Sequence, residues 1–189
     1  MSKLYLNNDW YFTETFTEDL LRLDLNTDAL VPVRIPHTNK LLPYHYFSED
    51  SYQMLCGYRK TLFAPDSWRG KKVLLTFEGA AHKAAVFING MQCAEHCCGY
   101  TAFTADISEF LLFNQENIIT VRLDTREASE LPPFGHVIDY MTYGGIYRDV
   151  YIDVKEKNNL NDVFHQADMY GNLKTDICID GDLIPDLTI

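Results

Sequence analysis

The segment from Tyr143 to Ile152 has the sequence Tyr-Gly-Gly-Ile-Tyr-Arg-Asp-Val-Tyr-Ile. The paired glycines Gly144 and Gly145 allow a positive φ or a bulge, and the alternation of residues after them predicts a strand. In that strand Arg148 falls on the same side as the apolar residues, where an unpaired guanidinium would be costly. We therefore predict a kinked start of a strand here and a structural partner for the arginine.

Upstream of this segment, short stretches with the two-residue alternation of strands follow one another closely, and hardly any helical periodicity is present. The clearest are Trp10–Phe16, Gly57–Ala64, Lys71–Glu78, Ala84–Ile88, Met91–His96, Thr101–Ala105 and Asn117–Thr125. Asn89-Gly90 is a strong signal for a two-residue hairpin turn. The segment that contains Pro32 and Pro36 can form only an edge strand or an extended stretch, because proline cannot donate a hydrogen bond within a sheet. Eight or more short strands with long connections predict an all-β fold, an antiparallel β-sandwich of the jelly-roll type.

A domain boundary is expected near residues 155–161, because the run Lys-Glu-Lys-Asn-Asn-Leu-Asn has the polar, charged composition of a linker. After it, Val163–Tyr170 and Leu173–Ile179 predict two further strands, which cannot bury a core by themselves. We therefore predict one domain over residues 1–156, followed over residues 157–189 by a linker and the start of a second β-domain. The alternative is a hairpin that packs on the first domain.

The composition indicates an acidic globular protein. Of the 189 residues 47% are hydrophobic, which is enough for a core, and 16 basic against 27 acidic residues give a net charge of −11. This charge argues against nucleic acid or an anionic membrane as the main partner. The residues show no apolar run typical of a signal sequence or a membrane span, and the five cysteines have no disulfide-framework spacing. We therefore expect a cytoplasmic protein with reduced thiols.

No motif in these residues by itself indicates catalysis. The acids show no spacing that singles out a catalytic pair, and the Gly-x-Ser-x-Gly motif and phosphate-binding glycine loops are absent. The cysteines lack the Cys-x-x-Cys pair of a zinc site. We therefore predict no catalytic residue, metal or cofactor in this segment. Taken alone, the residues indicate a binding module with long aromatic connections at 38–52 and 127–142.

Four short motifs follow one another along the chain. They are Phe77-Glu78-Gly79-Ala80 with Val86-Phe87-Ile88-Asn89-Gly90, His96-Cys97-Cys98-Gly99-Tyr100-Thr101-Ala102-Phe103, Asn117-Ile118-Ile119-Thr120-Val121-Arg122-Leu123-Asp124, and Gly145-Ile146-Tyr147-Arg148-Asp149-Val150. This ordered set resembles the N-terminal sugar-binding domain of glycoside hydrolase family 2, the family of β-galactosidases, β-glucuronidases and β-mannosidases. The resemblance covers about residues 1–156 and implies a galactose-binding-like jelly roll. The tail resembles the start of the immunoglobulin-like domain that follows in the family.

Members of this family are retaining exo-glycosidases whose two catalytic glutamates lie in a later (β/α)8 barrel. The resemblance therefore implies that the complete protein is a glycoside hydrolase, with β-galactosidase ahead of β-glucuronidase, and that this segment alone is inactive. It implies as partners a β-galactoside substrate, other domains of the same chain and, in the complete protein, further copies of itself. A free-standing carbohydrate-binding module and a purely structural docking domain are the competing classes.

The resemblance also implies a residue of the sugar site. In the family, an acid nine positions before the arginine of the closing motif accepts hydrogen bonds from sugar hydroxyls, and counting back from Arg148 gives Asp139. A carboxylate suits this role because it can accept two hydroxyl donors at once, although by position alone Asp139 would be an ordinary loop acid. His136 and Tyr140 are further candidates for the same rim. For Glu78 and Arg148 we predict a structural pairing across the sheets.

Overall fold

The computed structural model describes residues 3–45, 48–131 and 144–181. Within these ranges the regular structure consists of β-strands and four 3-10 turns, η1 (Glu18–Leu21), η2 (Glu49–Ser51), η3 (Asp66–Trp68) and η4 (Ser108–Phe110), with no α-helix. None of the helical turns in the described part of the chain has the length and hydropathy needed to cross a membrane. The all-β prediction is confirmed.

The larger sheet has six strands in the order β3-β2-β4-β10-β7-β8, and all neighbours run antiparallel. Its strands are β2 (Trp10–Thr13), β3 (Val31–Val33), β4 (Leu55–Ala64), β7 (Lys83–Ile88), β8 (Met91–Cys97) and β10 (Gln115–Asp124). The proline-containing strand β3 lies at the edge, where a missing N–H is tolerated. Asn89 and Gly90 join β7 to β8 with φ values of 52° and 81°, which confirms the predicted hairpin.

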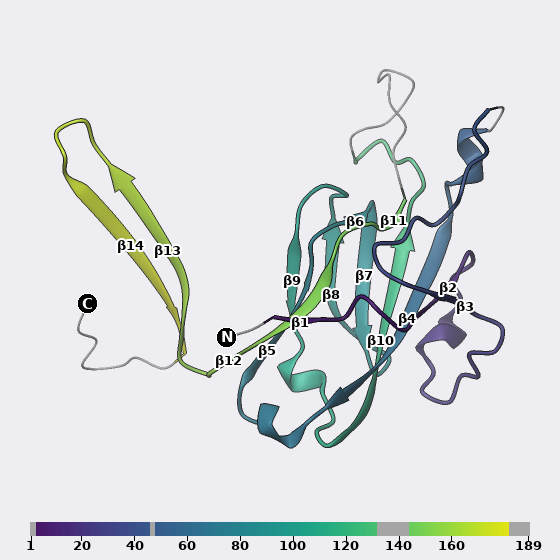
Figure 1. Cartoon of the computed structure of the whole chain (residues 1–189), viewed down its shortest axis with the longest axis horizontal. Helices are drawn as coiled ribbons and strands as arrows, with labels where there is room; N and C mark the ends of the chain where they lie inside the picture. The colour runs from purple at the N-terminus through teal and green to yellow at the C-terminus, as the bar shows by residue number, and fades with distance from the viewer. Residues whose placement is uncertain (1–2, 46–47, 132–143, 182–189) are drawn as a thin grey trace.

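The smaller sheet faces the larger one across the core (Figure 1). It has the order β1-β12-β5-β9, formed by β1 (Leu4–Tyr5), β5 (Lys72–Phe77), β9 (Phe103–Asp106) and β12 (Val150–Lys155). The largest side chains that are fully buried come from both sheets and include Trp10, Tyr58, Leu75, Phe77, Ile119, Leu123 and Ile152. Burying these apolar groups is what holds the two layers together.

The glycine-led segment forms two short strands and a bend instead of one continuous strand. Its first strand, β11 (Gly145–Ile146), pairs with β6 (Ala80–Ala81), and β12 starts only at Val150. Gly145 has a φ of 123°, and a Cβ there would collide with the carbonyl oxygen of His37, so the position requires glycine. The predicted kink is confirmed. Because the bend interrupts the alternation, Arg148 is exposed and does not share a face with its apolar neighbours.

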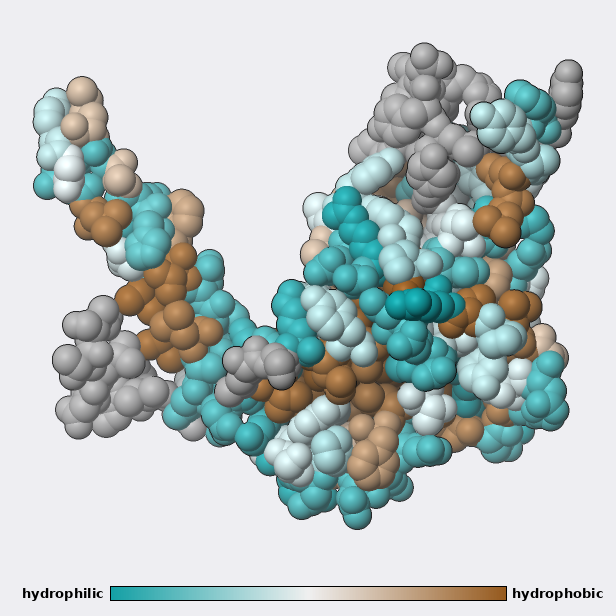
Figure 2. Space-filling model, viewed as in Figure 1, coloured by the Kyte–Doolittle hydropathy of each residue, from teal (hydrophilic) through white to brown (hydrophobic). Residues whose placement is uncertain are grey.

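The last two described strands, β13 (Asn159–Ala167) and β14 (Leu173–Asp180), pair with each other in a sheet of their own. Figure 1 shows this hairpin projecting from the sandwich, and Figure 2 shows apolar residues along it that remain uncovered. Leu160 and Leu173 are 55% and 64% exposed. Two strands are present as predicted, but β13 begins at Asn159, inside the run expected to be a linker, and ends at Ala167. The assignment of residues 157–189 to a second domain stays a prediction.

Candidate functional site

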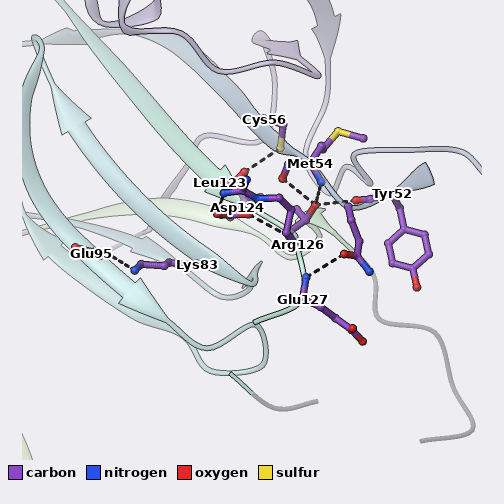
Figure 3. A network of polar contacts seen from close by, with 11 residues as sticks. Tyr52, Met54, Cys56, Lys83, Glu95, Leu123, Asp124, Arg126 and Glu127 are labelled. Atoms are coloured by element: carbon purple, nitrogen blue, oxygen red, sulfur yellow. Dashed lines mark hydrogen bonds and ion pairs between the residues drawn. The ribbon is translucent and has the colours of Figure 1, made fainter. Parts of the chain in front are cut away.

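The two long connections meet the larger sheet at the same end. One connection leads into β4 at Leu55, and the other leaves β10 after Asp124, and these two residues are partners in the β4–β10 ladder. Strand β7 begins beside them, with Lys83 opposite Asp124. Figure 3 shows the polar network at this end of the sheet, which we call the loop end.

Three of the site residues predicted from the sequence, Asp139, His136 and Tyr140, lie outside the described residues, and their role stays a prediction. The chain on both sides of them is described, up to Leu131 before and from Gly144 after. The candidate site is therefore described through the residues that precede and follow this segment.

Glu78 and Arg148 each have a partner other than the predicted one. The carboxylate of Glu78 lies 3.9 Å from the Nζ of Lys3, and the guanidinium of Arg148 lies over the ring of Tyr147, 5.5 Å from its centroid. The bend between β11 and β12 explains the difference, because it turns Arg148 out of the strand register on which the prediction depended.

Asn39 forms hydrogen bonds to residues at the ends of both long connections. Its side chain is 3% exposed, and its Nδ2 donates hydrogen bonds to Tyr52 O at 2.7 Å and to Thr125 Oγ1 at 3.1 Å. Its backbone N–H donates to Gly144 O at 3.0 Å. One residue therefore contacts the chain before β4, the end of β10 and the chain before β11.

Thr125 extends the pairing of β4 and β10 beyond the ends of the strands. It is 1% exposed, and its hydroxyl accepts a hydrogen bond from Met54 N at 3.0 Å and donates to Tyr52 O at 2.7 Å. Two residues further on, Glu127 N donates to Gln53 Oε1 at 3.2 Å. The start of the second connection is thus tied to the end of the first (Figure 3).

His37, two residues before Asn39 in the chain, is paired with a second titratable side chain, Tyr58. His37 Nδ1 is 2.9 Å from the hydroxyl of Tyr58, and His37 N donates to Ile146 O at 2.8 Å. Burial lowers the pKa of His37 and raises the pKa of Tyr58, because the charged form of each group is poorly solvated there. Both groups are therefore neutral near pH 7, and a hydrogen bond between two neutral groups joins them.

The outer side of the loop end carries an ion-paired carboxylate. Burial opposes the ionisation of Asp124, but hydrogen bonds from the side chain and backbone of Arg126 outweigh it, so that the pKa of Asp124 is lowered. Arg126 Nε and Nη2 donate to its two oxygens at 2.8 and 2.6 Å. Lys83 forms a separate pair with Glu95 at 3.3 Å. Such partly exposed pairs contribute about 1 kcal/mol or less each to stability.

The cavities in the described part of the chain do not by themselves mark a sugar site. The loop end has a cavity of about 240 Å³ lined by Leu55, Lys83, Arg122, Asp124 and Arg126. A larger cavity of about 620 Å³ lies at the opposite end, beside η4 and the base of the hairpin. We give the loop end more weight because both long connections join there. Within the described ranges no group of three or more His, Cys, Asp or Glu side chains is placed to hold a metal ion.

Sequence reasoning did not find Asn39 or Thr125 as site residues. Thr125 was the last residue of a predicted strand, and Asn39 lay inside a connection with no periodic pattern. No spacing in the sequence links residues that are 86 positions apart, so only the folded chain brings the pair together.

Comparisons with known proteins agree with this architecture. The family model "Glycosyl hydrolases family 2, sugar binding domain" matches residues 44–156. A β-galactosidase of Thermoanaerobacter pseudethanolicus is 37% identical over 177 residues, which are 93% of this chain and 24% of that protein. A β-glucuronidase of Bacteroides fragilis is 31% identical over 156 residues, which are 82% of this chain and 21% of that protein.

A crystal structure of a Bacteroides uniformis β-glucuronidase resembles the fold with a TM-score of 0.74 at 26% identity, over 85% of this chain and 18% of that one. The chain spans about a quarter of the length of the curated relatives it matches. The family model covers more than half of the 189 residues and includes the strands that build the loop end. The chain therefore belongs to the sugar-binding domains of the glycosyl hydrolases of family 2.

Proposed function

We propose that this chain is the N-terminal sugar-binding domain of a retaining exo-glycosidase that hydrolyses β-galactosides. In this proposal the chain supplies one edge of the sugar site, and the catalytic glutamates lie in a later barrel domain of the complete protein. The observation that carries the proposal is the 37% identity to a β-galactosidase over 93% of the chain. The relatives are about four times longer than this chain, which supports a piece of an enzyme over a free-standing module.

A β-glucuronidase is the second candidate. The match to the Bacteroides fragilis β-glucuronidase favours it, with 31% identity over 82% of the chain, and the resembling crystal structure from Bacteroides uniformis is also named a β-glucuronidase. The sugars of the two enzymes differ at C6, where galactose has a hydroxymethyl group and glucuronic acid a carboxylate. Direct comparison of the two substrates therefore separates the candidates.

Within the proposed site, Asp139 accepts hydrogen bonds from sugar hydroxyls. A carboxylate that accepts from neutral donors forms charge-assisted hydrogen bonds worth roughly 1.5–3 kcal/mol each. Support comes from the described flanks, because Thr125 before the segment and Gly144 after it are both bound to Asn39. A segment with both flanks held at one place can present a side chain to a neighbouring domain.

Residues 157–189 are proposed to begin a second β-domain of the same chain. The family model ends at residue 156, and the exposed Leu160, Phe164 and Leu173 of the hairpin would be covered by further strands. Two strands alone do not bury a core, so the hairpin needs such a partner to be stable.

The test uses the full-length protein with p-nitrophenyl β-galactoside and p-nitrophenyl β-glucuronide. We expect the galactoside to have the higher kcat/KM, and Asp139→Ala to lower that value about a hundredfold through lost transition-state binding. Glu116→Ala is the control, because Glu116 is exposed at the opposite end of β10. If Asp139→Ala lowers kcat/KM by less than about threefold, Asp139 does not contact the sugar. Faster hydrolysis of the glucuronide would replace the galactosidase assignment by the alternative.

A further inference from the structure

We propose that the cavity on the outer side of the loop end binds a small oxyanion, and that Arg122 holds its charged group. The cavity has a volume of about 240 Å³, and its lining consists of Leu55, Lys83, Arg122, Asp124 and Arg126. All of these residues belong to the described part of the chain. The ligand class is a small molecule with a carboxylate or a phosphate group. The inference does not depend on the role proposed for Asp139.

The first argument is that Arg122 lacks a partner, although it is partly buried. The strands of the larger sheet contain three other lysine or arginine residues. Arg59 and Lys60 donate hydrogen bonds to backbone carbonyl groups, and Lys83 is paired with Glu95. Arg122 makes no hydrogen bond, ion pair or ring contact among the described residues. Its guanidinium carries five N–H donors in a planar fork, and these are available to a ligand.

The second argument is the space around Arg122 in the sheet. Its neighbours on the adjacent strands are Gly57 and Ala85, so no long side chain lies beside it in either ladder. A Cβ built on Gly57 would collide with the side chain of Leu20, which therefore fills the space above that glycine. Thr120, two residues before Arg122 on the same face, donates a hydrogen bond to Leu20 O at 3.3 Å. The outer face is thus covered beside Arg122, and the cavity begins where this cover ends.

The third argument is the charge of the lining. Three of the five lining residues are cations, and Asp124 is the only acid. Both oxygens of Asp124 accept hydrogen bonds from Arg126 (Figure 3). When Glu95, the partner of Lys83, is included, the cations still outnumber the acids by three to two. The cavity is therefore positively charged in a protein of net charge −11, and a concave cationic site concentrates anions.

The class of ligand follows from the chemistry and the size of the cavity. A guanidinium binds carboxylate and phosphate groups through two parallel hydrogen bonds, which gives it a preference for these anions. The cavity is smaller than the sites of roughly 300–1,000 Å³ that hold drug-sized molecules. We therefore expect a ligand about the size of inorganic phosphate or of a single sugar acid such as glucuronate.

The main experiment measures whether an anion shields Arg122 in the full-length protein. Phenylglyoxal modifies accessible guanidinium groups, and mass spectrometry of the digested protein reports the rate at each arginine. The rate falls by one plus the ratio of ligand concentration to Kd, so a Kd of about 2 mM predicts a decrease of about sixfold at about 10 mM ligand. The two probes are inorganic phosphate and sodium glucuronate.

The controls separate a specific site from general effects of salt or sugar. Sodium chloride at the same ionic strength should leave the rate at Arg122 near its value in buffer, and so should D-glucose, which is uncharged. Arg34 is the internal control, because it is an exposed arginine that follows β3 at the far edge of the larger sheet. Its modification rate should be the same with and without either probe.

Four variants of the full-length protein test the lining by titration calorimetry with inorganic phosphate. Arg122→Gln should weaken binding about tenfold or more, because it removes charge-assisted hydrogen bonds to the ligand. Lys83→Gln should weaken binding about threefold, and Asp124→Asn should strengthen it by a similar factor, since each changes only the local charge. Arg34→Gln makes the same change in net charge as Arg122→Gln and should leave the affinity unchanged.

The outcomes decide the proposal. Shielding of Arg122 by both probes supports a general oxyanion site, and shielding by one probe alone supports a site for that group. Equal rates in chloride and in both probes would overturn it, as would unchanged phosphate affinity in Arg122→Gln. If Arg122 reacts only after the protein is unfolded in urea, another part of the protein covers the cavity and the proposal fails. The labelling experiment uses the wild-type protein, so it stands even if a variant does not fold.

Discussion

Each end of the larger sheet contains a buried asparagine, and the two asparagines are bonded differently. Asn117 is 0% exposed and makes four side-chain hydrogen bonds, to Leu112 N, Leu112 O, Gln115 O and Asn89 Nδ2. Asn39, at the loop end, makes two and leaves its Oδ1 without a partner among the described residues. The first asparagine closes a turn completely, whereas the second places three pieces of chain next to one another.

The surroundings of the two asparagines also differ in charge. The groups bonded to Asn117 are backbone atoms and the neutral amide of Asn89. At the loop end, burial lowers the pKa of His37 and of His82, and Asp124 is held ionised by Arg126. The neutral, fully bonded surroundings of Asn117 indicate a structural role for that side chain. An end with unpaired and titratable groups is typical of a region whose geometry serves function, since functional sites concentrate such groups.

The largest effect on stability is expected for Asn117→Ala. The substitution removes four hydrogen bonds, so that Leu112 N loses its side-chain acceptor and Asn89 Nδ2 keeps only its bond to Phe110 O. We expect a loss of about 3 kcal/mol in the free energy of unfolding, because each of the four lost hydrogen bonds contributes about 0.5–1.5 kcal/mol. Urea unfolding of this chain, followed by the fluorescence of the buried Trp10, measures it. A loss below about 1 kcal/mol would show that Asn117 contributes no more to stability than is expected for Asn39.

A smaller loss is expected for Asn39→Ala, about 1 kcal/mol in the same urea experiment. Tyr52 O keeps the hydrogen bond from Thr125 Oγ1, so no acceptor at this site loses its only partner. Removing the unpaired Oδ1 also offsets part of the cost. If Asn39→Ala lowers the free energy of unfolding as much as Asn117→Ala does, the two asparagines do not differ in their contribution to stability.

The smallest effect is a pH dependence confined to the loop end. The pKa of folded His37 lies below its ordinary value of about 6.5, so the unfolded chain binds the proton first as the pH falls. The free energy of unfolding should therefore be constant above about pH 6.5 and should fall below it, until the folded-state pKa is passed.

His37→Gln removes this contribution. The drop in urea midpoint between pH 7 and pH 5 should therefore be smaller in the variant than in the wild type. His165→Gln, on the exposed face of the hairpin, serves as the control. An unchanged pH response in His37→Gln would show that His37 does not carry this dependence.

Much of the fold could be predicted because its signals are local. Alternating residues indicated the strands of both sheets, and Asn89-Gly90 indicated the hairpin between β7 and β8 through its positive φ angles. The error at Arg148 has the same origin. Alternation was continued through the bend between β11 and β12, whereas Arg148 lies over the ring of Tyr147 and Glu78 is paired with Lys3.

By itself the sequence determined the fold class, the order of the strands along the chain and the family, because periodicity, turn residues and ordered motifs are properties of neighbouring residues. Only the tertiary structure decided that Asn39, Thr125 and Gly144 meet, since hydrogen bonds between residues 86 and 105 positions apart depend on how the connections pack on the ends of β4 and β10. The physical reason is that a buried amide has no periodic signature, and its partners exist only once the two layers have closed over the core.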